Sequence, residues 1–355
     1  MRRERPTGPE SRHTTNGLIP GGYHMGKKNH GMRILLLVAL AALGAAALVT
    51  SCGGGGGGGA AQNDAALTAA NSGAAASAVA QALALLEPSI STGDLVPAGV
   101  SAKAPLDAII DRMRAMSGLW DGPQAQGSMH DSGPCTGGGS ATVDASWTGP
   151  DQPAGPHEMV NLQMTISASN CSEYPYTMNG TLTLKFSGPL DTPTGFTLSA
   201  SSAHFVDALY PFDFSMSGFS MALTGITYSG GSIIGGTATL NGSVSGNVAG
   251  EALNEGFQNF HIAYSEITGG AFSYDLSGRM RASCLGGWVT VSTPATITGQ
   301  STDECPTDGA LAISSAGDTV EVLIASDYSM SVYYNGALVH SYAHCGELTG
   351  VCSAP

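Results

Sequence analysis

The sequence predicts a mainly β protein, an antiparallel β-meander that is either sandwich-like or a curled open sheet, with one or two short N-terminal helices and disulfide bracing. Glycine and proline together make up about 19% of the 355 residues against a usual ~12%, which argues against a helical bundle. Charged residues make up 11% and apolar residues 42%, a balance typical of neither a disordered chain nor a multi-span membrane protein. Short runs that alternate apolar residues with Ser or Thr, and the six cysteines that follow Cys52, complete the argument.

The N-terminal region has the layout of an export signal. An unbroken apolar run spans residues 34–49, with Lys27, Lys28 and Arg33 before it and small residues ending at Cys52 after it. The segment Leu48-Val49-Thr50-Ser51-Cys52 resembles the lipobox of bacterial lipoproteins. An uncleaved membrane anchor is the alternative, because about 16 apolar residues nearly span a thin bilayer.

The lipoprotein resemblance implies a processing pathway and a location. It implies cleavage between Ser51 and Cys52, diacylation (palmitate-type) of the Cys52 thiol and acylation of its new amine, which together anchor a protein firmly. The partners are then the membrane and the lipoprotein-processing and sorting machinery. Gly53 stands where a retention Asp would mark the inner membrane, so we expect the outer membrane, facing the periplasm or the surface. Residues 1–24 fit no signal, and we expect translation to start at Met25 or Met32.

The processed chain is expected to begin with a tether and a helical segment. Residues 52–77 contain seven consecutive glycines followed by Ala, Asn and Ser, a composition typical of a flexible linker. Residues 78–120 are expected to be helical, with helices over 74–87 and 105–117. In the second helix Leu106, Ile109, Ile110 and Met113 share one face, which predicts packing across a sheet.

The remaining chain is expected to form an antiparallel β domain over residues 121–300 and a C-terminal β subdomain over residues 301–355, continuous with it. Alternation with a period of two predicts half-buried strands. The clearest runs are 181–186, 237–240, 288–291, 311–313, 320–324 and 330–334. Apolar parity changes at Thr224-Gly225, which predicts a β-bulge there.

A weak internal repeat indicates a hairpin unit that recurs along the chain. A strand followed by a loop and an Asn/Ser-Gly step occurs three times, with the steps at 179–180, 241–242 and 277–278. Three such copies predict a meander of similar hairpins with the Gly step inside or at the start of the second strand.

The cysteines predict disulfides, since an exported chain with an even number of them favours pairing. The candidates are Cys135, Cys171, Cys284, Cys305, Cys345 and Cys352. Cys135 and Cys171 flank a hairpin of strands 140–147 and 159–168, and this is the pairing best supported by the pattern. Cys284 with Cys305 would bracket a hairpin centred near Pro294, and Cys345 with Cys352 would close a short loop; Cys305 with Cys345 is the alternative.

Motifs for catalysis or cofactors are weak. Gly242-Ser243-Val244-Ser245-Gly246 has Val where a nucleophile elbow has Ser, so we expect no catalytic residues, resident metal or cofactor. Asp303, Glu304 and Asp308 form a weak Ca²⁺ candidate without EF-hand spacing. His340 and His344 would lie about 13 Å apart on one strand, too far to share an ion, and are expected to be surface or cross-strand residues.

Charge and anchoring define the expected function. Residues 1–51 hold seven of the 13 basic and two of the 27 acidic residues, so processing leaves a formal net charge of −19, which disfavours nucleic acid as a partner. We expect an outer-membrane lipoprotein whose β domain serves binding or surface-structural work, with a protein or glycan ligand. The alternatives are an exported enzyme acting on envelope or extracellular glycans, and an envelope assembly or transport factor.

Overall fold

The computed structural model describes residues 63–84, 128–149, 158–173, 176–190, 192–207, 212–229, 232–248, 251–267, 270–300 and 305–348. Several predicted features lie outside these ranges: the signal segment with Ser51 and Cys52, the glycine tract, the helix over 105–117, and the residues Asp303, Glu304 and Cys352. Within the described ranges the chain is mainly β, as predicted.

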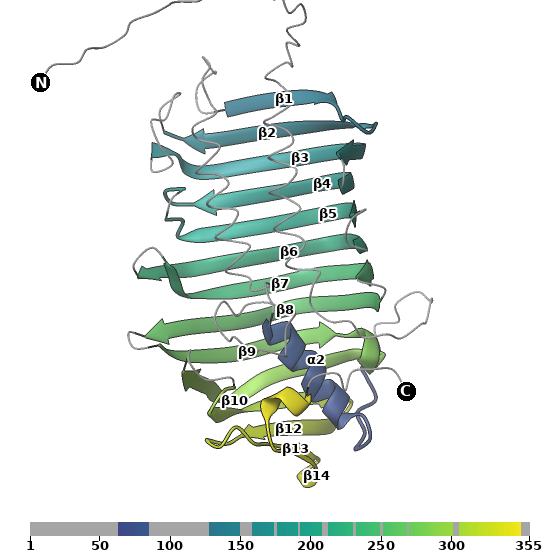
Figure 1. Ribbon diagram of the computed structural model, residues 1–355, viewed down its shortest axis with the longest axis vertical. Coiled ribbons are helices and arrows are strands. Elements are labelled where there is room, and N and C mark those ends of the chain that lie inside the picture. The colour runs from purple at the N-terminus through teal and green to yellow at the C-terminus, as the bar shows by residue number, and fades with distance from the viewer. Residues whose placement is uncertain are drawn as a thin grey trace, which may run out of the picture.

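Fourteen strands form one open antiparallel sheet in which each strand pairs with its neighbours in sequence (Figure 1). This is the meander that the sequence predicts, in the open-sheet form. The strands are β1 (Ser128–Pro134), β2 (Ser140–Thr148), β3 (Val160–Glu173), β4 (Tyr176–Ser187), β5 (Gly195–Asp207), β6 (Phe212–Ser229), β7 (Ser232–Val248), β8 (Glu251–Ile267), β9 (Ala271–Arg281), β10 (Trp288–Gln300), β11 (Asp308–Ser315), β12 (Asp318–Ile324), β13 (Met330–Tyr334) and β14 (Ala337–Tyr342).

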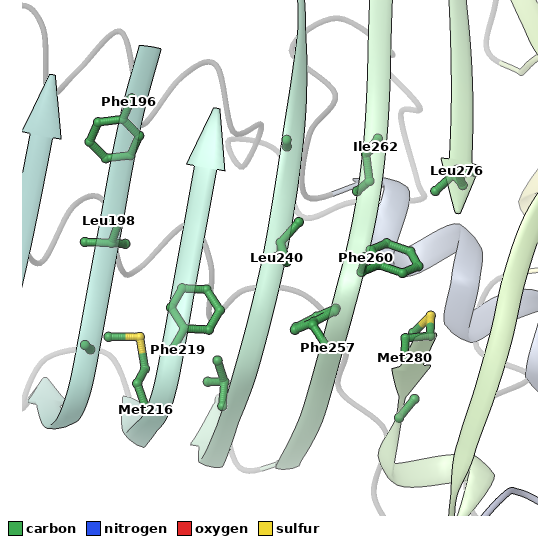
Figure 2. Close-up of a cluster of buried hydrophobic side chains, with 14 of the residues drawn as sticks. Phe196, Leu198, Met216, Phe219, Leu240, Phe257, Phe260, Ile262, Leu276 and Met280 are labelled. Atoms are coloured by element: carbon green, nitrogen blue, oxygen red, sulfur yellow. The ribbon is translucent and has the colours of Figure 1, made fainter. Parts of the chain in front are cut away.

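Alternation along the strands places apolar side chains on one face. In β2 the buried positions are Ala141, Val143, Ala145 and Trp147, and polar residues lie between them. Cross-strand pairing extends this pattern sideways, because a period of two keeps paired residues on one face of the sheet. Figure 2 shows the resulting layer of buried side chains across β5 to β9, with Leu198, Leu240 and Phe260 among them.

A line of irregularities crosses the sheet and bends the strands. Register shifts occur in neighbouring strand pairs between Ala168 and Cys171, Gly180 and Leu182, Ser217 and Ser220, Leu240 and Gly242, and Gln258 and His261. Residues of positive φ stand along this line: Asn170, Gly180, Gly218, Gly242, Asn259 and Gly278. Bulges increase the local bend and twist of a strand, so the strands on this line bend where it crosses them.

The Asn/Ser-Gly steps of the sequence repeat lie on this line. They fall inside β4, β7 and β9, which are the second strands of three hairpins, as the repeat predicts. A Cβ atom on Gly242 would overlap the carbonyl oxygen of Gly218 on the adjacent strand. Asn241 contacts the neighbouring strand on the other side of β7, because its Oδ1 accepts the N–H of Asn259 at 2.8 Å. Each Asn/Ser-Gly step therefore lies between two neighbouring strands whose pairing is interrupted by bulges.

The single helix of the described chain, α2 (Ser72–Ala84), packs against the C-terminal strands. It starts earlier than the predicted residue 74, inside the segment expected to be tether, because Thr68 and Asn71 exchange backbone-to-side-chain hydrogen bonds at its start. Ala75, Ala76 and Val79 are fully buried. The helix contacts β12 and β13 and the short 3₁₀ segments η2 (Ser283–Leu285) and η3 (Cys345–Leu348), so it packs at the C-terminal end of the sheet (Figure 1).

One of the predicted disulfides is confirmed, and the pairings expected for Cys305 and Cys345 are corrected. Cys135 pairs with Cys171 beside the β2–β3 hairpin, as predicted. Cys305 pairs with Cys345, with 6.0 Å between their Cα atoms, so the pairings of Cys284 with Cys305 and of Cys345 with Cys352 are wrong. Cys284 is also disulfide-bonded, and its partner lies outside the described residues.

Pro294 explains one of these errors. It was expected to centre a turn, but β10 continues through it as one strand from Trp288 to Gln300. Pairing with β9 is interrupted between Val289 and Ile297, where a residue without an N–H is tolerated. Thr293 Oγ1 accepts the N–H of Leu276 at 3.1 Å across this gap. The bulge predicted at Thr224-Gly225 is confirmed by a register shift between Thr224 and Thr227.

Candidate binding face of the sheet

The polar face of the sheet carries two continuous rows of mainly hydrophilic side chains, one across β2 to β7 and one across β2 to β9, and we call these two rows the hydroxyl face. Cross-strand pairing aligns the members of each row, one residue per strand. The first row is Asp144, Thr165, Thr183, Ser199, Ser220 and Asn241. The second row is Ser146, Gln163, Lys185, Thr197, Ala222, Thr239, His261 and Ser277. All of these residues are exposed or half-buried.

The spacing of the hydroxyl face follows from sheet geometry. Neighbouring members of a row are about 4.8 Å apart and the two rows about 7 Å apart, because adjacent strands and alternate residues have these separations. Asp144 and Lys185 are the formally charged members of the two rows. The face is therefore a regular and nearly neutral array, in contrast with the acidic composition of the whole chain.

Hydrogen bonds between side chains order this face. The hydroxyls of Thr165 and Thr183 lie 3.3 Å apart on β3 and β4, and Ser167 and Thr181 repeat the arrangement at 3.3 Å. Thr239 Oγ1 lies 2.9 Å from His261 Nδ1 on β7 and β8. Such cross-strand pairs hold short polar side chains in defined positions.

Exposed histidines of the same polar face pair with carboxylates. His130 on β1 lies 2.6 Å from Asp144 on β2, and His204 on β5 lies 2.7 Å from Asp213 on β6. His130 and Asp144 are directly opposite each other in the pairing register, whereas His204 and Asp213 are diagonal neighbours, because His204 pairs with Ser215 and Asp213 with Val206. They connect the side chains of neighbouring strands, and both contacts are solvent-exposed, where such pairs contribute little to stability.

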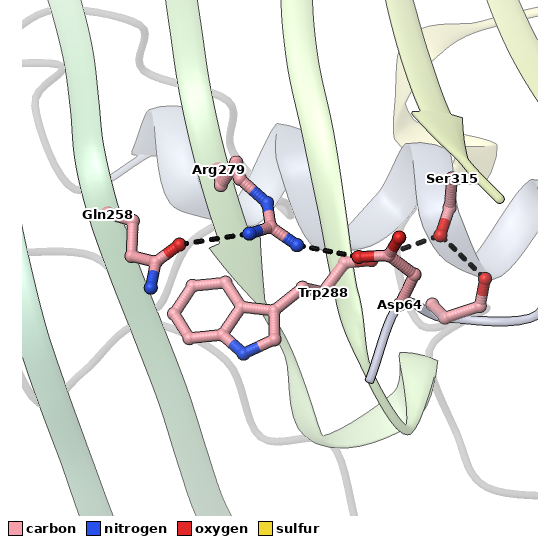
Figure 3. A network of polar contacts seen from close by, with 6 residues as sticks. Asp64, Gln258, Arg279, Trp288 and Ser315 are labelled. Carbon is pink, nitrogen blue, oxygen red and sulfur yellow. Dashed lines mark hydrogen bonds and ion pairs between the residues drawn. The ribbon is translucent and has the colours of Figure 1, made fainter. Parts of the chain in front are cut away.

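A second polar cluster joins the N-terminal segment to the sheet (Figure 3). Arg279 donates to Asp64 at 2.6 Å and to Gln258 at 3.2 Å, and its guanidinium lies 5.6 Å from the ring centre of Trp288. Ser315 Oγ donates to the carbonyl oxygens of Ala65 and Trp288 at 2.6 and 3.1 Å. The cluster attaches residues 63–65 to the sheet and is not an open site.

One cluster of potential metal ligands occurs in the described part of the chain, formed by Cys305, His344 and Cys345. Its two sulfurs are joined in the disulfide, so they are not thiolate ligands in this state. His344 Nε2 lies 3.3 Å from Cys305 Sγ. The sequence does not predict this contact, because it places His344 on a strand as a surface or cross-strand residue, whereas β14 ends at Tyr342.

Only some of the predicted site residues lie within the described ranges. The lipidation and cleavage residues, Cys52 and Ser51, lie outside the described residues, as do Asp303 and Glu304 of the Ca²⁺ candidate. Asp308, the third member, is exposed at the start of β11, and its Oδ1 accepts the N–H of Gly309 at 2.8 Å. Gly242 to Gly246, the weak nucleophile motif, runs within β7.

Comparison with known proteins gives no match: no protein-family model, no curated protein and no solved structure is significantly similar to this chain. The candidate site therefore rests on the chain's own geometry. None of the helices in the described ranges is long and apolar enough to span a membrane.

Proposed function

We propose that this protein is an outer-membrane lipoprotein, anchored through Cys52, whose hydroxyl face binds a neutral glycan polymer. The observation that carries the proposal is the pair of continuous rows, one across β2 to β7 and the other across β2 to β9. The lipid anchor rests on the lipobox resemblance at residues 48–52.

The chemistry of the hydroxyl face suits a polymer that is rich in hydroxyl groups. Ser, Thr, Asn and Gln offer both donors and acceptors, which match the donors and acceptors of sugar hydroxyls. Short side chains such as Ser and Thr lose little rotamer entropy when they are held against a ligand. The near absence of charge favours a neutral glycan over a polyanion or a polycation.

The mode of binding follows from the flat, repeating array. Each hydrogen bond to a sugar contributes only about 0.5–1.5 kcal/mol net. A polymer that contacts several strands at once adds many such bonds, and its second and later contacts are intramolecular. We therefore expect weak binding to short oligosaccharides and firm binding to extended or insoluble chains.

Co-sedimentation of the processed protein with insoluble cellulose, chitin and purified peptidoglycan tests the glycan proposal. Replacing Thr165 and Thr183 together by Val keeps side-chain shape and removes two hydroxyls, so we expect affinity to fall about tenfold for the polymer that binds. The control replaces Thr290 and Thr319, exposed residues on β10 and β12, by Val and leaves binding unchanged. Wild-type protein that binds none of the three polymers, or equal binding by the Thr165/Thr183 variant, contradicts the proposal.

Fatty-acid labelling tests the anchor separately. A bacterial host grown with a radioactive fatty acid should label the wild-type protein, because acyl chains are attached to Cys52. The Cys52→Ala variant should carry no label and remain unprocessed. Label that persists in this variant would disprove the lipoprotein assignment without affecting the glycan proposal.

A further inference from the structure

The apolar face of β2 to β9 is buried, although the strands form a single layer. Leu182, Leu184, Leu198 and Phe260 on this face are 0% exposed. Neighbouring strands shield the flanks of such side chains, but the tips stand away from the sheet and need a second layer above them. A single chain accounts for this burial, so the second layer belongs to the chain itself.

The main contacts of the described helical elements lie in the C-terminal half of the sheet. The helix α2 contacts β12, β13, η2 and η3, while η2 contacts β8 and η3 contacts β14. None of these contacts involves the side chains above β2 to β7. The cover over these strands therefore has to come from residues outside the described ranges.

The connection between α2 and β1 has to pass most of the sheet. The helix α2 ends at Ala84 in the part that packs on β12 and β13, whereas Ser128 starts β1 at the opposite edge (Figure 1). The strand order puts β1 and β12 eleven strand separations apart, a span of about 53 Å. The 43 residues from 85 to 127 would reach about 65 Å even as one continuous helix. This segment is therefore long enough to cross the sheet in a helical form.

The position of α2 indicates which side of the sheet the connection follows. Ala75 and Val79 of α2 belong to the same buried cluster as Leu198 and Phe260 of the apolar face. The segment therefore leaves α2 on the apolar side. Its sequence fits that side, because the helix predicted over 105–117 has one apolar face, formed by Leu106, Ile109, Ile110 and Met113.

The other segments outside the described ranges fit the apolar face less well. The apolar run 34–49 belongs to the predicted signal peptide, and residues 53–59 are glycines without side chains to bury. Residues 349–355 follow η3 at the far end of the sheet, and the remaining gaps connect consecutive strands. Residues 85–127 thus combine the length, the route and the apolar surface that a cover needs.

We propose that residues 85–127 form the second layer of this protein and cover the apolar face of β2 to β9. The helix over 105–117 packs on this face through its apolar side. The protein is then a two-layer domain, and the polar face with its two rows of side chains is the one left free for a ligand. This inference does not depend on the glycan proposal, because it concerns the opposite face of the sheet.

Photo-cross-linking identifies what covers the apolar face. Ile110 of the processed protein is replaced by p-benzoylphenylalanine, which bonds to a neighbouring C–H group on illumination, and the product is mapped by mass spectrometry. The proposal requires a cross-link within one chain to an apolar-face residue of β2 to β9, such as Leu198 or Phe260. The matched control carries the same group at Ala115, on the opposite side of the predicted helix, and should not reach this face. Cross-links from position 110 to a second chain, to the hydroxyl face or to no residue of the sheet overturn the proposal.

Thermal unfolding tests the packing of the helix. Ile109→Ser combined with Ile110→Ser removes two apolar side chains from the proposed interface, and we expect the unfolding midpoint to fall by about 5 °C or more. The control, Asp111→Ser combined with Ala115→Ser, changes the opposite side of the same helix and should shift the midpoint by less than about 2 °C. An isoleucine variant that fails to fold beside a folded control also supports the packing. An isoleucine variant with the midpoint of the wild type or of the control overturns the proposal.

Discussion

At the scale of single residues, glycine and asparagine determine how the strands bend. Gly242 has a φ of +89°, and its missing side chain leaves space for the carbonyl of Gly218. Gly225 also has a positive φ, +62°, but no atom lies within 4 Å of the position that a Cβ would take. The two glycines therefore have the same conformational requirement and differ in their surroundings.

This difference gives a prediction for alanine substitution. Gly242→Ala should lower the free energy of unfolding by about 2–3 kcal/mol, because backbone strain is combined with a steric overlap inside the sheet. Gly225→Ala should cost only about 1 kcal/mol, the strain alone. Urea unfolding midpoints of the two variants and the wild type measure the difference. Equal losses would show that the contact between β6 and β7 is unimportant.

At the scale of elements, the carboxylate of Asp318 accepts side-chain hydrogen bonds that connect β12 with the end of β13. Asp318 Oδ1 accepts hydrogen bonds from Asn335 Nδ2 and the Tyr334 hydroxyl, both at 2.9 Å. These bonds, that of Asn335 first, lower the pKa of Asp318 below its ordinary value of 3.8. The same contact with Asp318 raises the pKa of Tyr334. The Tyr334 hydroxyl also lies 3.3 Å from the carbonyl of Leu67, so the hairpin contacts the chain just before α2.

The pH dependence of stability follows from the direction of this shift. A lowered pKa means that folded Asp318 binds a proton less readily than unfolded Asp318, so its contribution is present above about pH 4 and is lost as the pH falls through the folded-state pKa. Between pH 6 and pH 3 the unfolding midpoint should therefore decrease less in Asp318→Asn than in the wild type. Glu321→Gln, which removes an acid from the same hairpin, is the control. Parallel curves for the wild type and Asp318→Asn would contradict the prediction.

At the scale of the whole molecule, fourteen strands in one open sheet exceed the number usually reached without curling or splitting. Two features accommodate this length. A line of bulges crosses β3 to β9, and α2 packs against β12 and β13 at the C-terminal end of the sheet (Figure 1). Each of the two fully described disulfides braces one end of the sheet, Cys135–Cys171 near β1 and Cys305–Cys345 near β14.

Local patterns determined the fold class, the positions of most strands, the three repeated hairpins and the pairing of Cys135 with Cys171. These features depend on alternation and on turns between neighbouring segments, so the sequence contains the information directly. Tertiary structure alone decided that Cys305 joins Cys345 across 40 residues, that Pro294 lies within a strand, that His344 meets a sulfur, and that scattered Ser and Thr residues form a continuous face. The reason is physical: a side chain's face follows from its own strand, but its neighbours follow from the register of every strand between them.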